Sequence, residues 1–141
     1  MTEYNSLSAF FADNAERAED AEAVISDRFK GDDNKPIKWK FRALAAAELK
    51  NVRNMCYTTD AKGKRVVDEE AAAVKCIALS VVYPDLNNTD LQASYNARNA
   101  ADLLQNMLYV NEFNKAAEVF QNMNMLENDS LEAQVETVKN S

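Results

Sequence analysis

Histidine is absent from the 141 residues of the sequence, and its absence limits the chemistry available to the chain. Enzymes use histidine more than any other side chain as a general base, and zinc sites use it as a ligand. Nucleophilic triads that pair serine or cysteine with histidine are excluded. The two cysteines, Cys56 and Cys76, form no Cys-x-x-Cys motif, and we interpret them as buried core thiols. We therefore predict that the protein is not an enzyme and holds no metal and no cofactor.

Glycine and proline are scarce, with two residues of each. Both residue types interrupt helices, so their scarcity favours a helical fold, and two glycines cannot build a phosphate-binding glycine loop. The most apolar stretch, residues 71–83, is too short to span a bilayer. The chain opens with acidic and polar residues instead of the basic start of a secretion signal. We expect a protein that works in a cytosol and does not enter a membrane.

The charge is unevenly divided along the chain. Residues 1–34 carry nine acidic and three basic side chains, residues 35–65 carry two and nine, and residues 66–141 carry twelve and four. A basic centre between acidic ends suits an acidic partner or another copy of the chain, whereas a charged, solvated surface is the simpler alternative. The net charge of −7 opposes binding to phosphates, so we predict no nucleic-acid partner.

The pattern of apolar residues predicts one domain with four parts. We predict a mainly α fold, in which a compact helical domain of about five helices follows an N-terminal β-hairpin. The parts are an acidic, helical or partly flexible segment at 1–22, the hairpin at 23–43, a helical core at 44–126 and an acidic C-terminal segment at 127–141. The last segment is too short to form a stable helix alone, so it docks, frays or binds a partner.

The hairpin prediction depends on strict alternation in its second strand. Apolar Ile37, Trp39 and Phe41 alternate with basic Lys38, Lys40 and Arg42. Such alternation places the apolar side chains on one face of a strand and the basic ones on the other. The first strand is predicted within residues 23–29, and the turn-rich residues 30–36 connect the two. We predict that the three basic residues mediate self-association.

Helical spacing defines the remaining elements. Asp68 is a suitable N-cap for a helix that Pro84 limits, because the residue before a proline avoids helical geometry. Thr89 and Gln92 form a capping box for a helix that continues to residue 108. The other predicted elements are a helix from residue 44 to about 57, a polar loop at 60–65 and a helix from Asn111 to Met123.

Methionines and aromatic residues cluster late in the chain. Surfaces rich in methionine and aromatic side chains adapt to different partners, although ordinary packing between helices produces the same spacing. We predict a groove between the helices near 90–108 and 111–124 that accepts a partner helix. The predicted binding residues are Met107, Tyr109, Phe113, Phe120, Met123 and Met125.

Taken in order, several short runs resemble the XkdN-like phage tail assembly chaperones over about residues 22–124. The front runs are Ile25–Phe29 and Pro36–Arg42, followed by Glu48 and Cys56. The rear runs are Ser80–Leu86, Leu91–Tyr95, Ala101–Leu104, Met107–Leu108 and Asn111–Phe113. Two positions depart from the family's pattern. Asn111 stands where the family tends to have glycine, and no serine or threonine cap precedes the helix that contains Glu48.

The resemblance implies a protein that binds the tape measure protein while a phage, prophage or phage-tail-like bacteriocin builds its tail. Such a chaperone works in the cytoplasm of the host bacterium and is absent from the finished particle. Two other readings stay open at this point. One is a tail or baseplate accessory protein that is retained in the particle, and the other is a small helical adaptor protein.

Overall fold

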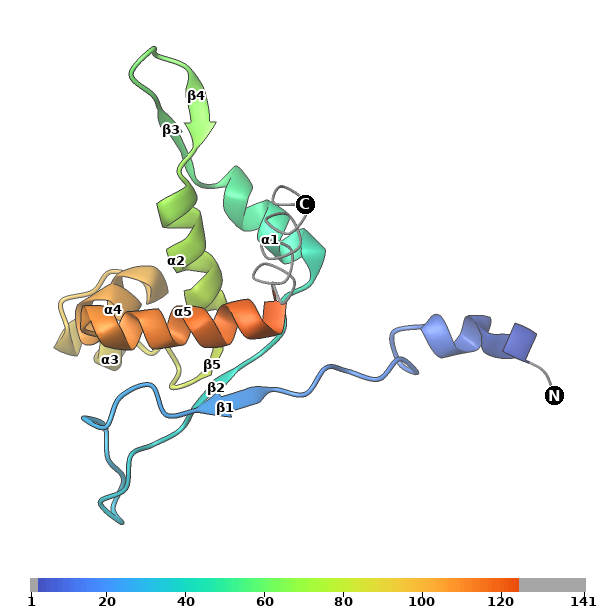
Figure 1. Ribbon diagram of the computed structural model, residues 1–141, viewed down its shortest axis with the longest axis horizontal. Helices are drawn as coiled ribbons and strands as arrows, with labels where there is room; N and C mark the ends of the chain where they lie inside the picture. The colour runs from blue at the N-terminus through green and yellow to red at the C-terminus, as the bar shows by residue number, and fades with distance from the viewer. Residues whose placement is uncertain (1–2, 125–141) are drawn as a thin grey trace, which may run out of the picture.

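The computed structural model describes residues 3–124, and helix α2 (Glu69–Ser80) lies at the centre of the fold (Figure 1). Six of its twelve residues are buried, because it packs against three other helices. Those helices are α1 (Ala46–Asn54), α4 (Ala100–Met107) and α5 (Val110–Asn124). The predicted cap is confirmed, since the Asp68 carboxylate accepts a hydrogen bond of 3.1 Å from the backbone N–H of Ala71.

A three-stranded antiparallel sheet closes one end of the core. Its order is β1 (Ala21–Ala23), β2 (Trp39–Phe41) and β5 (Val81–Tyr83). Strand β5 follows α2 without a loop, and in the register Ala21 lies opposite Phe41 while Ala23 lies opposite Trp39. The predicted apolar face of β2 is confirmed, because the Trp39 and Phe41 side chains are fully buried.

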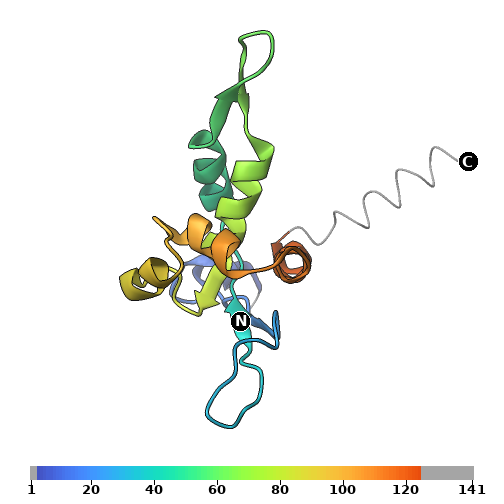
Figure 2. The same ribbon diagram turned by 90° about the vertical axis from the view of Figure 1, so that its left-hand side faces the viewer.

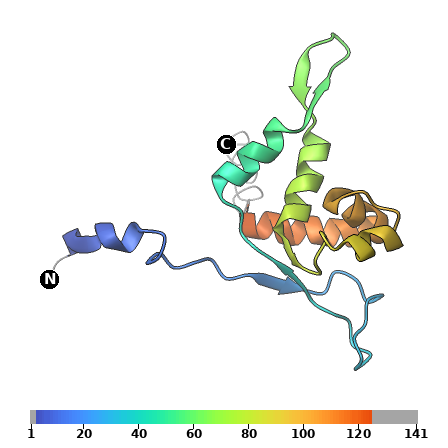
Figure 3. The same ribbon diagram turned by 180° about the vertical axis from the view of Figure 1, so that it is seen from behind.

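A second, two-stranded sheet is formed by β3 (Tyr57–Thr59) and β4 (Arg65–Val67), and it projects from the helices (Figures 1 and 3). The turn between these strands contains Gly63 at a φ of +80°, a conformation that glycine adopts without strain. The guanidinium of Arg65 lies 4.1 Å from the centre of the Tyr57 ring.

The prediction of a mainly α fold is wrong, because five short strands accompany the helices within residues 3–124 and the architecture is mixed α/β. The sequence predicts residues 81–83 as the end of a helix, but their β-branched and aromatic side chains suit the strand that pairs with β2. The polar loop predicted after α1 is the turn of the β3–β4 hairpin. The first N-terminal strand is displaced to Ala21–Ala23, and β5 extends the predicted hairpin to three strands.

The helix predicted from Thr89 to residue 108 is divided into α3 (Thr89–Ser94) and α4. Asn96, between them, has a φ of +55°, which interrupts the helical path. The predicted capping box is also wrong, because the caps of α3 and α4 are Asn88 and Asn99. Their side chains accept hydrogen bonds of 2.9 Å from the backbone N–H groups of the third helical residues.

The core is formed by α2, β2 and the apolar sides of the flanking helices. In Figure 2, α5 is viewed end-on and lies across the body from α3. Cys56 and Cys76 are buried and unbonded, as their interpretation as core thiols predicted. Burial raises the pKa of the Cys76 thiol, which makes this group less reactive. The largest fully buried side chains are those of Ile25, Trp39, Phe41, Leu86, Leu103 and Leu104.

An N-terminal arm, residues 3–20, extends away from the body (Figures 1 and 3). It begins with a 3-10 helix at Glu3–Phe10 and continues as an exposed, acidic connection to β1. Leu7, Phe10 and Phe11 are 69%, 79% and 58% exposed, so the arm presents apolar side chains to solvent.

Candidate functional site

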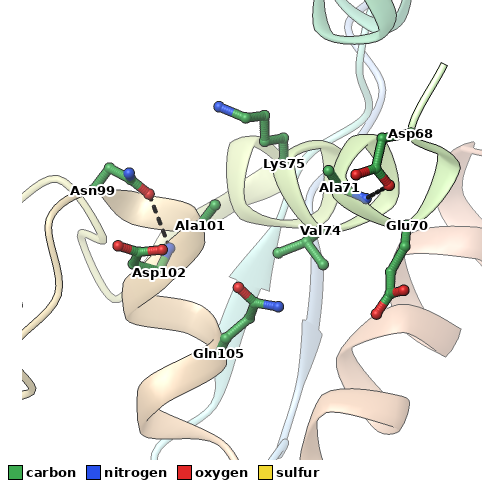
Figure 4. A pocket seen from close by; sticks show the side chains of 9 residues that line it. All are labelled: Asp68, Glu70, Ala71, Val74, Lys75, Asn99, Ala101, Asp102 and Gln105. Atoms are coloured by element: carbon green, nitrogen blue, oxygen red, sulfur yellow. Dashed lines mark hydrogen bonds between the residues drawn. The ribbon is translucent and has the colours of Figure 1, made fainter. Parts of the chain in front are cut away.

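A depression with a largely polar lining shows no catalytic arrangement. It has a volume of about 300 Å³ between α2 and α4, and Figure 4 shows Glu70, Lys75 and Asp102 pointing away from one another. The Asp102 carboxylate pairs with Arg98 at 2.9 Å, which lowers its pKa. Within residues 3–124, no group of three histidine, cysteine or acidic side chains is placed to hold a metal ion.

The most buried charged cluster of the described chain joins the loop after β1 to α5. The guanidinium of Arg28 donates two hydrogen bonds to the Glu112 carboxylate, one of them 3.0 Å long, and Ser26 donates another. Arg28 also donates to the Met107 carbonyl at 2.7 Å and lies 4.3 Å from the centre of the Tyr109 ring. The hydrogen bonds from Arg28 hold the pKa of Glu112 at about 2, so this carboxylate is charged at neutral pH.

A related pair lies at the start of α1. Arg42 donates to both oxygens of the Glu48 carboxylate, at 3.1 and 2.7 Å, and these bonds lower the pKa of Glu48 to about 2. The same carboxylate accepts a hydrogen bond of 2.9 Å from the backbone N–H of Ala45, the N-cap of the helix. Glu112 likewise accepts a hydrogen bond of 2.9 Å from the backbone N–H of Tyr109, which precedes α5. Both glutamates therefore compensate an unpaired N–H group at a helix start while binding an arginine from an earlier part of the chain.

A pair of adjoining, mainly apolar depressions runs along α2 and α5, and we call it the α2–α5 groove. Their volumes are about 210 and 290 Å³, and both are lined by Ala73 and Phe113. The first continues toward α1 and includes Leu49, and the second includes Val110, which is 79% exposed. A groove between helices with this lining is a suitable seat for an amphipathic helix.

A smaller apolar pocket, the aromatic pocket, lies at the end of the three-stranded sheet near the loop between β1 and β2. Its volume is about 160 Å³, and each lining side chain is apolar or aromatic. The residues that line it are Phe29, Ile37, Trp39, Tyr83, Pro84, Leu91, Tyr95 and Met107.

The residues predicted to bind a partner are distributed over several places. Phe113 and Phe120 line the α2–α5 groove, and Met107 is buried at the base of the aromatic pocket. Tyr109 is 65% exposed over Arg28, and Met123 is partly buried against the core. Met125 lies outside the described residues.

The three basic residues predicted to mediate self-association have different environments. Arg42 is bound to Glu48, and the ammonium of Lys40 lies 3.9 Å from the carboxylate of Glu22. Lys38 is exposed and has no salt bridge with any residue between 3 and 124.

Comparison with known proteins identifies the family of this chain. The family described as "Phage XkdN-like tail assembly chaperone protein, TAC" matches residues 7–139, which is nearly the whole chain. The chain belongs to this family. The family is one of chaperones in phage tail assembly and not one of enzymes, and the chaperone acts in the host cell during assembly.

Among solved structures, the crystal structure of the protein yqbn resembles this chaperone with a TM-score of 0.70. The two sequences are 17% identical over 82% of this chain and 92% of the other, so the likeness concerns the fold alone. No match was found among curated proteins. None of the helices within residues 3–124 combines the length and the apolar character needed to cross a membrane.

Sequence reasoning missed the pairing of Arg28 with Glu112. Both residues stand in the runs that carry the family resemblance, one in the front run and the other in the rear run. Their 84-residue separation leaves no periodic signal that they meet. The available signal was the position of Glu112 in the first turn of the predicted helix, where an acidic side chain can accept from the N–H group before the helix.

Proposed function

We propose that this chaperone binds the tape measure protein of its phage or phage-like particle while the tail is assembled, and leaves before the particle is complete. The observation that supports the proposal is the α2–α5 groove on a member of a tail assembly chaperone family. It works in the cytoplasm of the host bacterium, where the tail proteins are made.

The groove fits a helical client better than a small molecule. Phe113 is partly buried and lines both depressions, so successive apolar side chains of one helix can occupy the two depressions on either side of its ring. The Arg53–Glu69 pair lies at its edge, with N–O distances of 2.8 Å. A charged edge around an apolar centre is the usual arrangement of a protein–protein interface.

Reversible binding follows from the small area of such a groove. A single site of this size holds its client weakly, whereas many copies along one elongated client together keep its apolar stripes covered. A weak individual contact also lets the growing tail tube displace one copy after another.

The first test is co-expression with the tape measure protein encoded in the same gene cluster, followed by affinity purification and light scattering. We expect a soluble complex with several copies of the chaperone for each tape measure chain. A tape measure protein that stays insoluble and uncomplexed would contradict the proposal. Mass spectrometry of purified particles tests departure, and finding the chaperone as a stoichiometric component would favour a retained structural protein.

Val110→Asp tests the groove itself. Val110 is the first residue of α5, where an acidic side chain is favourable to the helix, so the fold should be preserved. Asn111→Asp is the matched control, because it adds the same charge to the same helical turn at an exposed residue that does not line the groove. We expect Val110→Asp to lose most of the captured tape measure protein and Asn111→Asp to keep it. Equal capture by both variants would exclude the groove as the binding surface.

A further inference from the structure

Within the described residues, the N-terminal arm presents large apolar side chains to solvent. Leu7 and Phe10 are three residues apart in a 3-10 helix, so they lie on the same side of it, and Phe11 is adjacent. All three side chains are more than half exposed. Three large apolar side chains grouped on a projecting segment are typical of a protein-binding element.

The arm leaves the body at the end of the sheet that is opposite the aromatic pocket. In the antiparallel register, Ala21 lies opposite Phe41, whereas Ala23 and Trp39 lie next to the loop that borders the pocket. Figure 1 shows the arm extending to the opposite side from the loop between β1 and β2, which contributes Phe29 and Ile37 to the pocket. Residues 12–20 span up to about 30 Å when extended, which is enough to reach a neighbouring molecule.

The aromatic pocket has the size and chemistry for a phenyl ring. An apolar protein cavity of about 150 Å³ takes up benzene, and this pocket has a volume of about 160 Å³ with only apolar and aromatic lining. Tyr83 at its edge is 51% exposed, so the pocket opens to solvent. Phe10, which is 79% exposed against 58% for Phe11, presents a ring of the size that fits it.

Electrostatic attraction makes a smaller contribution to the contact between the arm and the pocket. The loop between β1 and β2, beside the pocket, carries Lys30, Lys35 and Lys38, and none of them forms a salt bridge within the described chain. Asp32 and Asp33 lie in the same loop. The connection between arm and sheet, residues 12–20, carries four acidic residues and one basic residue. The loop has a small positive excess and the connection a negative one, so their attraction is favourable and sensitive to salt.

We infer that the N-terminal arm of one copy docks on a second copy, with Phe10 in the aromatic pocket and Leu7 and Phe11 against its edge. Because the arm and the pocket are different surfaces at opposite ends of the sheet, the contact is head-to-tail and leaves one free arm and one free pocket after each addition. Such an array lengthens without closing unless its geometry forms a ring. The inference specifies how copies associate and does not require that they bind a tape measure protein.

Two complementary variants test the inference with the full chain alone. The arm variant is Phe10→Ser with Phe11→Ser, and the pocket variant is Ile37→Asp, chosen because Ile37 lines the pocket without belonging to the main core. Sedimentation velocity of wild-type protein over a range of concentrations should show oligomers that grow with concentration. Each variant alone should associate at least about tenfold more weakly.

Mixing the two variants gives the decisive result. The arm variant keeps an intact pocket and the pocket variant keeps an intact arm, so a head-to-tail contact predicts that the mixture forms a 1:1 dimer and nothing larger. A dimer also demonstrates that both variants are folded. Val110→Asp is the matched control, because it adds the same charge in the α2–α5 groove and should associate like the wild type.

Three results would overturn the inference. A wild-type chain that stays monomeric would place the arm on its own pocket or on another protein. Oligomers of the pocket variant alone would indicate that arms pack against arms. Two folded, monomeric variants that do not pair when mixed would exclude the arm–pocket contact. None of these results concerns the tape measure protein, so capture of that client is an independent outcome.

Discussion

The starts of helices α1 and α5 use the same chemistry at different depths. At α1, Glu48 binds Arg42, which is six residues away in the sequence, and the side chains of the two residues are 32% and 31% exposed. At α5, Glu112 binds Arg28, 84 residues away, and the Glu112 side chain is only 8% exposed. The first pair strengthens a local turn, whereas the second connects distant parts of the fold.

This difference shows how burial decides what an ion pair contributes. Water screens the exposed pair and can replace its hydrogen bonds when the pair is broken. A buried carboxylate that loses its arginine has no such replacement and retains the cost of its dehydration. The fold should therefore depend strongly on Glu112, weakly on Glu48 and hardly at all on a fully surface pair such as Arg53 with Glu69.

Acid should produce the largest effect, because it removes both helix-start pairs together. The pKa values of Glu48 and Glu112 are lowered from 4.5 to about 2 in the folded protein. Their contribution is complete above about pH 5 and is lost as the pH falls through the folded value, because the unfolded chain binds protons first. Urea unfolding between about pH 6 and pH 2 measures this, and Glu48→Gln with Glu112→Gln should flatten the dependence. An equally steep loss in the double variant would assign the acid sensitivity to other groups.

Glu112→Gln should be the most damaging single change of the set. It leaves Arg28 without a carboxylate in a largely buried site, and we expect the free energy of unfolding to fall by about 2–3 kcal/mol. Chemical denaturation followed by circular dichroism measures this loss. Glu118→Gln, at an exposed position of the same helix, is the control and should change stability by less than about 0.5 kcal/mol. Similar losses in both variants would show that burial of Glu112 does not increase its contribution to the free energy of unfolding.

Glu48→Gln should have an intermediate effect, with a loss of about 1 kcal/mol in the same denaturation experiment. The amide oxygen of glutamine can still accept from the Ala45 N–H, so the change removes the ionic part of the contact with Arg42 and keeps the cap. If the loss equalled that of Glu112→Gln, the comparison between the two helix starts would fail.

Arg53→Gln should have the smallest effect, within about 0.5 kcal/mol of the wild type. The Arg53 and Glu69 side chains are 44% and 66% exposed, although their two hydrogen bonds are each 2.8 Å long. Short distances alone would rank this pair with the other two. A loss above about 1 kcal/mol would show that geometry outweighs exposure at this position.

The sequence predicted the elements that depend on local signals. Asp68 is predicted correctly as the cap of α2, because capping acts within a few residues. The burial of Trp39 and Phe41 followed from strict alternation.

Elements that depend on distant partners were missed. Val81 to Tyr83 continue the apolar pattern of α2, and only pairing with β2 turns them into a strand. The α2–α5 groove contains the predicted Phe113 and Phe120, and Leu108 from the predicted 90–108 side also lines it. The contributions of α1 and α2 to its walls were not indicated by the late methionine cluster. Side-chain spacing reports which face of a helix is apolar and not which helix covers it.

The link between Arg28 and Glu112 also sets an order for events during synthesis. A ribosome that adds roughly 5–20 residues per second needs roughly 4–17 seconds to travel the 84 residues between them. During that interval Arg28 has neither the Glu112 carboxylate nor the α5 helix that carries it. The start of α5 is completed by Ser26 and Arg28, which are made long before it, so the loop after β1 and the start of α5 become stable together.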